Sequence, residues 1–209
     1  YFEEAIAGFI DYLDHPTLSG TAVRERLDAI EIANIKKRGY GTNNFTHNLK
    51  QCLETLRGRP CTERDEQTIS GMTERIRNHP IELFDGVEET LHYLSERHYL
   101  RIVTKGHHEE QLEKIQRSGL GQLFDDCSIV REKDVACYRT VVEQSKAEPS
   151  RTWMVGNSPK SDINPALAAG IGAVWIPHAQ TWALEHEEVP EPHDRFHVRE
   201  EFSDLRELF

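Results

Sequence analysis

The chain has 209 residues, of which 37% are hydrophobic and 29% charged, and its formal net charge is −11. This composition excludes an intrinsically disordered chain and a disulfide-rich scaffold, and no apolar run reaches the length of about 18–20 residues that spans a membrane. The acidic excess lies in residues 81–209, with 14 basic and 24 acidic side chains, whereas residues 1–80 carry 11 and 12. Such a chain repels phosphate polymers and anionic lipid, so we expect neither nucleic acid nor a membrane as a partner. The four cysteines are widely spaced, which favours reduced thiols and a cytoplasmic location.

Four segments of residues 1–80 carry apolar side chains at helical spacing, and this pattern predicts a small all-helical domain. Thr62 and Asp65 stand before the fourth segment with the spacing of a helix-capping box. Proline and glycine residues, which interrupt helices, separate the segments. The segments lie near residues 2–13, 23–30, 49–56 and 69–76.

After Pro80 the pattern changes to an alternation of helices and strands. This alternation predicts an α/β domain over residues 81–209, with a Rossmann-like parallel sheet and helices on both faces. We expect strands at residues 99–103, 127–130, 152–155 and 173–176 and a weaker one at 195–198, followed by an amphipathic helix to Phe209. The acidic stretch at residues 185–191 is expected to be a solvated helix end.

Three of the predicted strands are followed by hydroxyl, ammonium or carboxylate groups. In an open parallel sheet, ligands bind at the carboxyl ends of the strands. A hydroxyl group and a lysine suit a phosphoryl oxygen, and a carboxylate beside an amide suits Mg²⁺. The residues are Thr104, Lys105 and Gly106 after the first strand, Lys133 after the second, and Asn157 and Asp162 after the third.

Each of these residues also has a purely structural interpretation. A threonine after a strand commonly caps the next helix, and a loop lysine is commonly solvated. Asp162 could cap the helix that begins near Pro165. The order and spacing of the residues together favour a functional site.

From residue 83 to about residue 178, the order of these motifs resembles the haloacid dehalogenase (HAD) superfamily, in the subgroup with a helical cap inserted after the first strand. The most specific match is Val-Gly-Asn-Ser-Pro-Lys-Ser-Asp-Ile-Asn-Pro-Ala-Leu-Ala-Ala-Gly at residues 155–170. The resemblance implies that Thr104 binds the transferred phosphoryl group, that Lys133 steadies the nucleophile and that Asp162 binds the metal ion. Asn157 stands where many members carry a second Asp, so the metal site would have one charge fewer.

The resemblance implies a Mg²⁺-dependent phosphatase that acts on a small phosphorylated metabolite, with Lys105 and Gly106 completing the phosphate site. Residues 1–80 match the cap, which selects the substrate, by position and length only. Two alternatives stay open: a metal-free haloacid dehalogenase-type hydrolase, and a non-catalytic protein that binds phosphate or metal.

The family's first motif, a strand that ends in Asp-x-Asp and supplies the nucleophile, does not occur in the 209 residues. The nearest candidates, Asp11 and Asp14, are three residues apart within a helical pattern. We therefore expect this strand upstream of Tyr1, in a segment of roughly 10–20 residues. Without it, the sheet should be split, with unpaired edges.

Residues 36–45 form the most basic loop of the predicted cap. Lys37, Arg38, Tyr40 and Asn43 are candidates to bind the leaving group of the substrate. A helix C-terminus with Gly39 as its cap accounts equally well for the basic residues.

Overall fold

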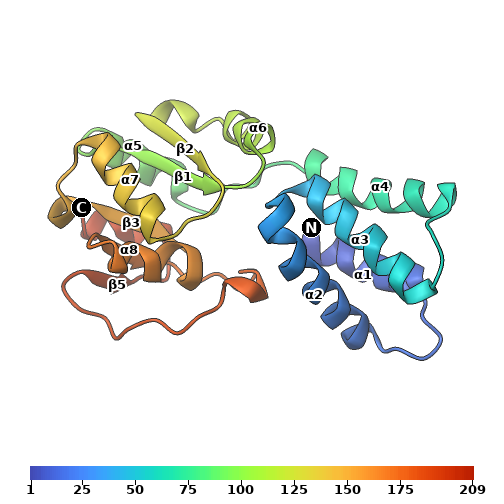
Figure 1. Ribbon diagram of the computed structural model, residues 1–209. Coiled ribbons are helices and arrows are strands. Elements are labelled where there is room, and N and C mark those ends of the chain that lie inside the picture. The colour runs from blue at the N-terminus through green and yellow to red at the C-terminus, as the bar shows by residue number, and fades with distance from the viewer. The chain divides into compact units, whose positions relative to one another are not determined.

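The computed structural model describes all residues, 1–209, and the chain divides into two compact units, Tyr1–Ile81 and Glu82–Phe209 (Figure 1). No helix in either unit combines the length and the apolar character needed to cross a bilayer. The first unit consists of four helices: α1 (Phe2–Leu13), α2 (Gly20–Arg38), α3 (Thr42–Arg57) and α4 (Glu63–Asn78).

The helices of the first unit pack around one apolar core, as their sequence periodicity predicts. Phe9, Leu27, Leu49 and Ile69, one from each helix, are fully buried in this core. Sequence signals fix several helix ends. The capping box predicted at the start of α4 is confirmed, because the Thr62 side chain accepts from the backbone N–H of residue 65 and the Asp65 carboxylate accepts in return.

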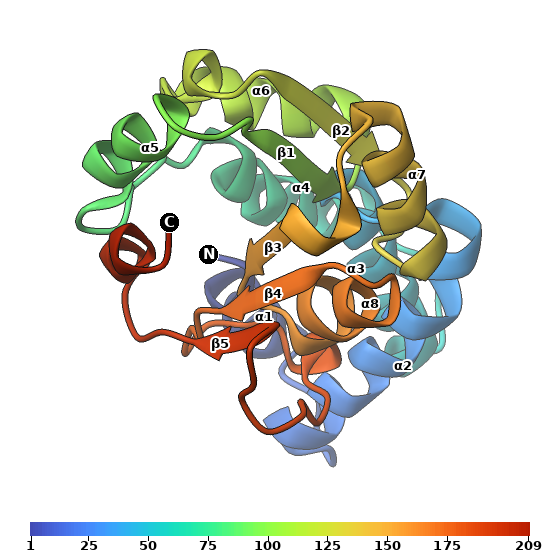
Figure 2. The same cartoon turned by 90° about the vertical axis from the view of Figure 1, so that its left-hand side faces the viewer.

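The second unit is a parallel α/β fold, which confirms the predicted fold class. In chain order it comprises α5 (Val87–Ser95), β1 (Arg101–Lys105), α6 (His108–Ser118), η1 (Gly121–Leu123), β2 (Asp126–Val130), α7 (Val135–Ser145), η2 (Pro149–Arg151), β3 (Trp153–Gly156), η3 (Pro159–Ile163), α8 (Asn164–Ala168), β4 (Gly172–Trp175), η4 (Ala183–Glu185), β5 (Phe196–Val198) and η5 (Phe202–Glu207). Figure 2 shows α7 and α8 on one side of the strands and α5 on the other.

The strands form two sheets rather than one. β1 pairs in parallel with β2, and β3, β4 and β5 form a parallel sheet in that order. The expectation of a split sheet with unpaired edges is therefore confirmed. β1 and β3 each lie at an edge of their sheet.

Both sheets nevertheless belong to one layer. Val103 of β1 and Met154 of β3 pack against the same buried cluster, which includes Tyr138 of α7 and Ala166 of α8. Leu100, just before β1, and Trp153 and Val155 of β3 pack against a second cluster, built from α5, β4 and η5. The two clusters hold the sheets side by side from opposite faces.

Two expectations for the C-terminal part are wrong. The closing helix, predicted to extend to Phe209, is a 3₁₀-helix that covers only Phe202–Glu207. The stretch at residues 185–191 is not solvated throughout, because Glu185 is 7% exposed.

Candidate active site

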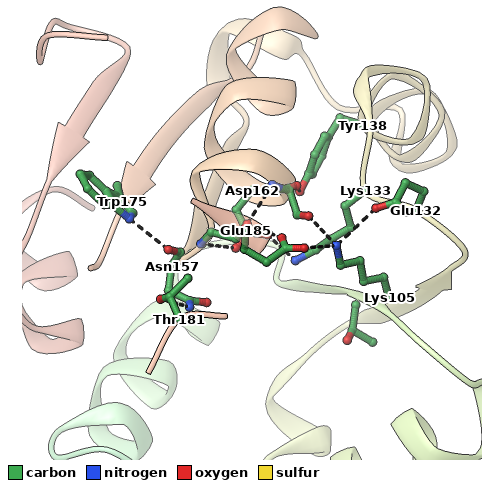
Figure 3. A network of polar contacts seen from close by, with 12 residues as sticks. Lys105, Glu132, Lys133, Tyr138, Asn157, Asp162, Trp175, Thr181 and Glu185 are labelled. Carbon is green, nitrogen blue, oxygen red and sulfur yellow. Dashed lines mark hydrogen bonds and ion pairs between the residues drawn. The ribbon is translucent and has the colours of Figure 1, made fainter. Parts of the chain in front are cut away.

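Contacts between charged side chains join the carboxyl ends of the two sheets. Lys105, the last residue of β1, donates from Nζ to Ser161 Oγ at 2.6 Å. Lys133, which follows β2, forms an ion pair with Asp162 Oδ1. Ser161 and Asp162 belong to η3, which follows β3, so side chains from three strand ends meet in one network (Figure 3).

Asp162 is held in a buried position by its own turn. Its side chain is 3% exposed, and its Oδ2 accepts from the backbone N–H of Ser158 at 3.0 Å. Ser158, not Asp162, caps this turn, because its hydroxyl accepts from the backbone N–H of Ser161. A Cβ at Gly156 would overlap the carboxylate of Asp162. Only glycine at the end of β3 therefore leaves room for this arrangement.

Lys105 is bound by carboxylates as well as by Ser161. Its Nζ lies 2.7 Å from Glu185 Oε1 and 3.3 Å from Glu132 Oε1. Glu185 lies in η4, and the sequence analysis missed it because its acidic neighbours suggested a solvated stretch. No local sequence signal distinguishes Glu185 from its exposed neighbours Glu187 and Glu188.

Burial and hydrogen bonding act in opposite directions on the Glu185 carboxyl. Burial raises its pKa, but hydrogen bonds from Lys105, Ser158 and Ser161 outweigh that effect. The pKa of Glu185 consequently lies below its usual range, and the group is a carboxylate at neutral pH.

Thr104 lies in β1 beside Lys105, but its hydroxyl donates to Gln111 Oε1 of α6 at 2.8 Å. Gly106 lies against the same glutamine: its φ is +148°, which favours glycine, and a Cβ there would come within 2.8 Å of Gln111 Nε2. The structure therefore brings Lys105, Lys133 and Asp162 into one network and leaves the Thr104 hydroxyl bonded to Gln111.

Asn157 and Asp162, the residues that the sequence predicts as metal ligands, both follow β3. Asn157 is exposed, and its Nδ2 donates to Thr181 Oγ1 at 2.7 Å. No group of three or more His, Cys, Asp or Glu side chains forms a metal site in the structure. One carboxylate and one amide oxygen fit the preference of Mg²⁺, which commonly completes its coordination with waters and substrate phosphate.

The four candidate residues of the first unit lie at the junction of α2 and α3. Helix α2 ends at Arg38 with Gly39 as its C-cap, which confirms the helix-end interpretation of the basic residues. Lys37 and Arg38 are exposed, Tyr40 is half-buried, and Asn43 Oδ1 accepts from Arg77 Nη2 at 2.9 Å. A role for these residues in substrate binding stays a prediction.

The sequence matches the haloacid dehalogenase-like hydrolase family over residues 26–176, and the chain belongs to this family. No curated protein matches the chain significantly. A haloacid dehalogenase-like family hydrolase from Xanthomonas campestris is 28% identical, with a TM-score of 0.77 over 90% of this chain and 79% of that one.

Two further solved structures share the fold at lower identity. A 2-haloacid dehalogenase from Pseudomonas syringae is 20% identical, with a TM-score of 0.64 over 99% of this chain and 90% of that one. The HAD-hydrolase YfnB from Bacillus subtilis, bound to magnesium, is 19% identical, with a TM-score of 0.60 over the same shares of the two chains.

Proposed function

We propose that this hydrolase is a Mg²⁺-dependent phosphatase acting on a small phosphorylated metabolite. The observation that carries the proposal is the meeting of Lys105, Lys133 and the buried Asp162 at the carboxyl ends of the strands. Two ammonium groups there suit a phosphoryl dianion, and a buried carboxylate suits a divalent cation.

The nucleophile in this proposal is a carboxylate on a strand that lies between β1 and β3 and is not among residues 1–209. The unpaired edges of β1 and β3 support such a strand. All residues of β1 and β3 are only half-buried, whereas β4, paired on both sides, is buried at Gly172, Ala173 and Val174. Inner strands of parallel sheets are normally covered on both faces, and a strand in this position would bring β1 and β3 closer to that state.

The residues of the chain then have distinct tasks. Lys133 stabilises negative charge on the attacking carboxylate and on the phosphoryl oxygens, and Lys105 binds those oxygens. The Thr104 hydroxyl gives up its hydrogen bond to Gln111 when the substrate binds, and donates a hydrogen bond to the phosphoryl group instead. Asp162 and Asn157 would hold Mg²⁺, which when bound would offset the negative charge of the phosphoryl group.

Residues 1–80 act in this proposal as the cap that excludes water and selects the substrate. Lys37, Arg38, Tyr40 and Asn43 would contact the leaving group. A cytoplasmic location is consistent with four free cysteines.

The test is hydrolysis of p-nitrophenyl phosphate by the natural protein, with Mg²⁺ and with a chelator. We expect activity that depends on Mg²⁺ and that falls by about 100-fold or more in Asp162→Asn. Asp194→Asn is the matched control, because the Asp194 side chain is 92% exposed. Unchanged activity in Asp162→Asn would contradict the metal assignment.

Two other outcomes would replace the proposal. Chloride release from a 2-chloro acid without Mg²⁺ would identify a dehalogenase. Binding of inorganic phosphate without turnover, in a protein with no Asp-x-Asp strand, would identify a non-catalytic binding protein.

A further inference from the structure

The carboxylate of Glu185 bridges two parts of the proposed site. Its side chain is 9% exposed. Its Oε1 accepts from Lys105 Nζ at 2.7 Å, and its Oε2 accepts from Ser158 Oγ at 2.5 Å. Lys105 ends β1 and Ser158 opens the turn after β3, so one side chain connects the two sheets (Figure 3).

Ser158 transmits this contact to the proposed metal ligand. Its hydroxyl donates its single proton to Glu185 and accepts from the backbone N–H of Ser161. Its own backbone N–H donates to Asp162 Oδ2. The orientation of the Asp162 carboxylate therefore depends on a turn that Glu185 holds in place.

Glu185 is also the main buried countercharge of Lys105. The Lys105 side chain is 13% exposed, and an ammonium group at this depth requires a paired carboxylate. Glu132 provides a second one, but its side chain is 44% exposed and its oxygen lies farther away, at 3.3 Å. Both oxygens of Glu185 accept hydrogen bonds from side chains of the protein itself.

We propose that Glu185 is a positioning residue, which holds Lys105 and the Ser158 turn so that the ammonium of Lys105 faces the phosphoryl group and the carboxylate of Asp162 faces the Mg²⁺ ion beside it. This inference rests on the proposed phosphatase function. Glu185 touches neither the substrate nor the metal ion and acts through Lys105 and Ser158.

A double-mutant cycle between Glu185→Gln and Lys105→Met tests this mechanism. The Glu185 carboxylate accepts from two donors, Lys105 Nζ and Ser158 Oγ. A glutamine has only one acceptor oxygen, so its NH₂ group would face one of these donors and that hydrogen bond would be lost. We expect each single variant to lower kcat/KM by about tenfold, the effect of losing one hydrogen bond to a charged group. The double variant should lose little more than Lys105→Met alone, because residues that act as a unit are not additive.

The split between kinetic parameters distinguishes positioning from a general loss of stability. In Glu185→Gln we expect a higher KM and a higher Mg²⁺ concentration at half-maximal rate. Saturating substrate and Mg²⁺ should restore the larger part of the lost rate. Glu187→Gln is the matched control, since Glu187 is an exposed carboxylate two residues along the same segment, and it should leave both values unchanged. Multiplied losses in the double variant, or a Glu185→Gln protein that behaves as Glu187→Gln does, would overturn the inference.

Calorimetric titration with inorganic phosphate separates this inference from the proposed function. Glu185→Gln should weaken phosphate binding by about tenfold even where no turnover occurs. A wild-type protein that binds phosphate but hydrolyses nothing overturns the phosphatase proposal alone, whereas normal phosphate binding by Glu185→Gln overturns the positioning role alone. If Glu185→Gln does not fold, Ser158→Ala replaces it, because this substitution removes the hydrogen bond that Ser158 donates to Glu185. A double-mutant cycle between Ser158→Ala and Lys105→Met then tests the positioning role by the same criterion.

Discussion

Replacing Glu31 with glutamine should stabilise the protein at neutral pH. Glu31 lies on α2 in the helical unit and is 7% exposed. Burial raises the pKa of its carboxyl group to about 7, and the negative charge of Asp28 adds to this effect. The charge of Arg24 and a hydrogen bond with Asn48 lower the pKa but do not offset the burial.

The sign and size of the effect follow from proton linkage. Below pH 4.5, the ordinary pKa of the group, the carboxyl is protonated in both the folded and the unfolded chain. Between pH 4.5 and about 7 the unfolded chain releases the proton while the folded chain keeps it, so the free energy of unfolding falls as pH rises. At about 1.4 kcal/mol per pH unit, the full loss above pH 7 is about 3 kcal/mol. Glutamine has no proton to release and escapes this loss.

Urea unfolding, followed by circular dichroism at 222 nm at pH 4 and pH 8, measures the effect. The stability difference between Glu31→Gln and the wild type should grow in favour of the variant by up to about 3 kcal/mol between these pH values. Glu25→Gln is the control, because Glu25 is exposed on the same helix. Wild type and Glu31→Gln with parallel pH profiles would refute the reasoning.

Three further substitutions probe the turn after β3 and the capping box of α4. If the protein is the phosphatase proposed above, Gly156→Ala should lower hydrolysis of p-nitrophenyl phosphate by about 100-fold, because the new Cβ displaces the Asp162 carboxylate; unchanged kinetics would contradict this. Tyr138→Phe should cost about 1 kcal/mol in urea unfolding, because the buried Tyr138 hydroxyl donates to the Ser161 carbonyl at 2.8 Å, and an unaltered midpoint would show that this bond is dispensable. Asp65→Asn should lower the thermal unfolding midpoint, since its hydrogen bonds hold the pKa of Asp65 well below 3.8. The deficit should shrink as the pH falls below 3.8, because the unfolded wild-type chain then binds a proton that the folded chain does not. A deficit equal at pH 3 and pH 7 would contradict the last prediction.

Local sequence patterns predicted the elements of the fold closely. Buried strands and amphipathic helices have distinct periods, so each of the five strands was placed to within two residues, and the four N-terminal helices were all found. The C-terminal helix was overestimated because the segment after β5 is short. Once the capping box of Glu201 and Asp204 has set its start, only a six-residue 3₁₀-helix follows.

Burial at the site was harder to predict than residue type. Lys133 and Asp162 could be found because each follows a strand with family-like spacing. Glu185 could not, because its neighbours Glu187 and Glu188 are exposed and the local composition does not distinguish them. The difference between these acids arises from tertiary contacts with Lys105 and Ser158, which no local pattern contains.

The pairing of charges follows the division of the sheet. Lys105 ends β1 and pairs with Glu185 after β4, and Lys133 follows β2 and pairs with Asp162 after β3. Each ion pair thus takes its cation from the two-stranded sheet and its anion from the three-stranded sheet, across separations of 80 and 29 residues. A strand that paired with both β1 and β3 would end beside these two ion pairs. A nucleophilic carboxylate must lie at this position if the two lysines are to stabilise the negative charge on it and on the phosphoryl oxygens during its attack on phosphorus.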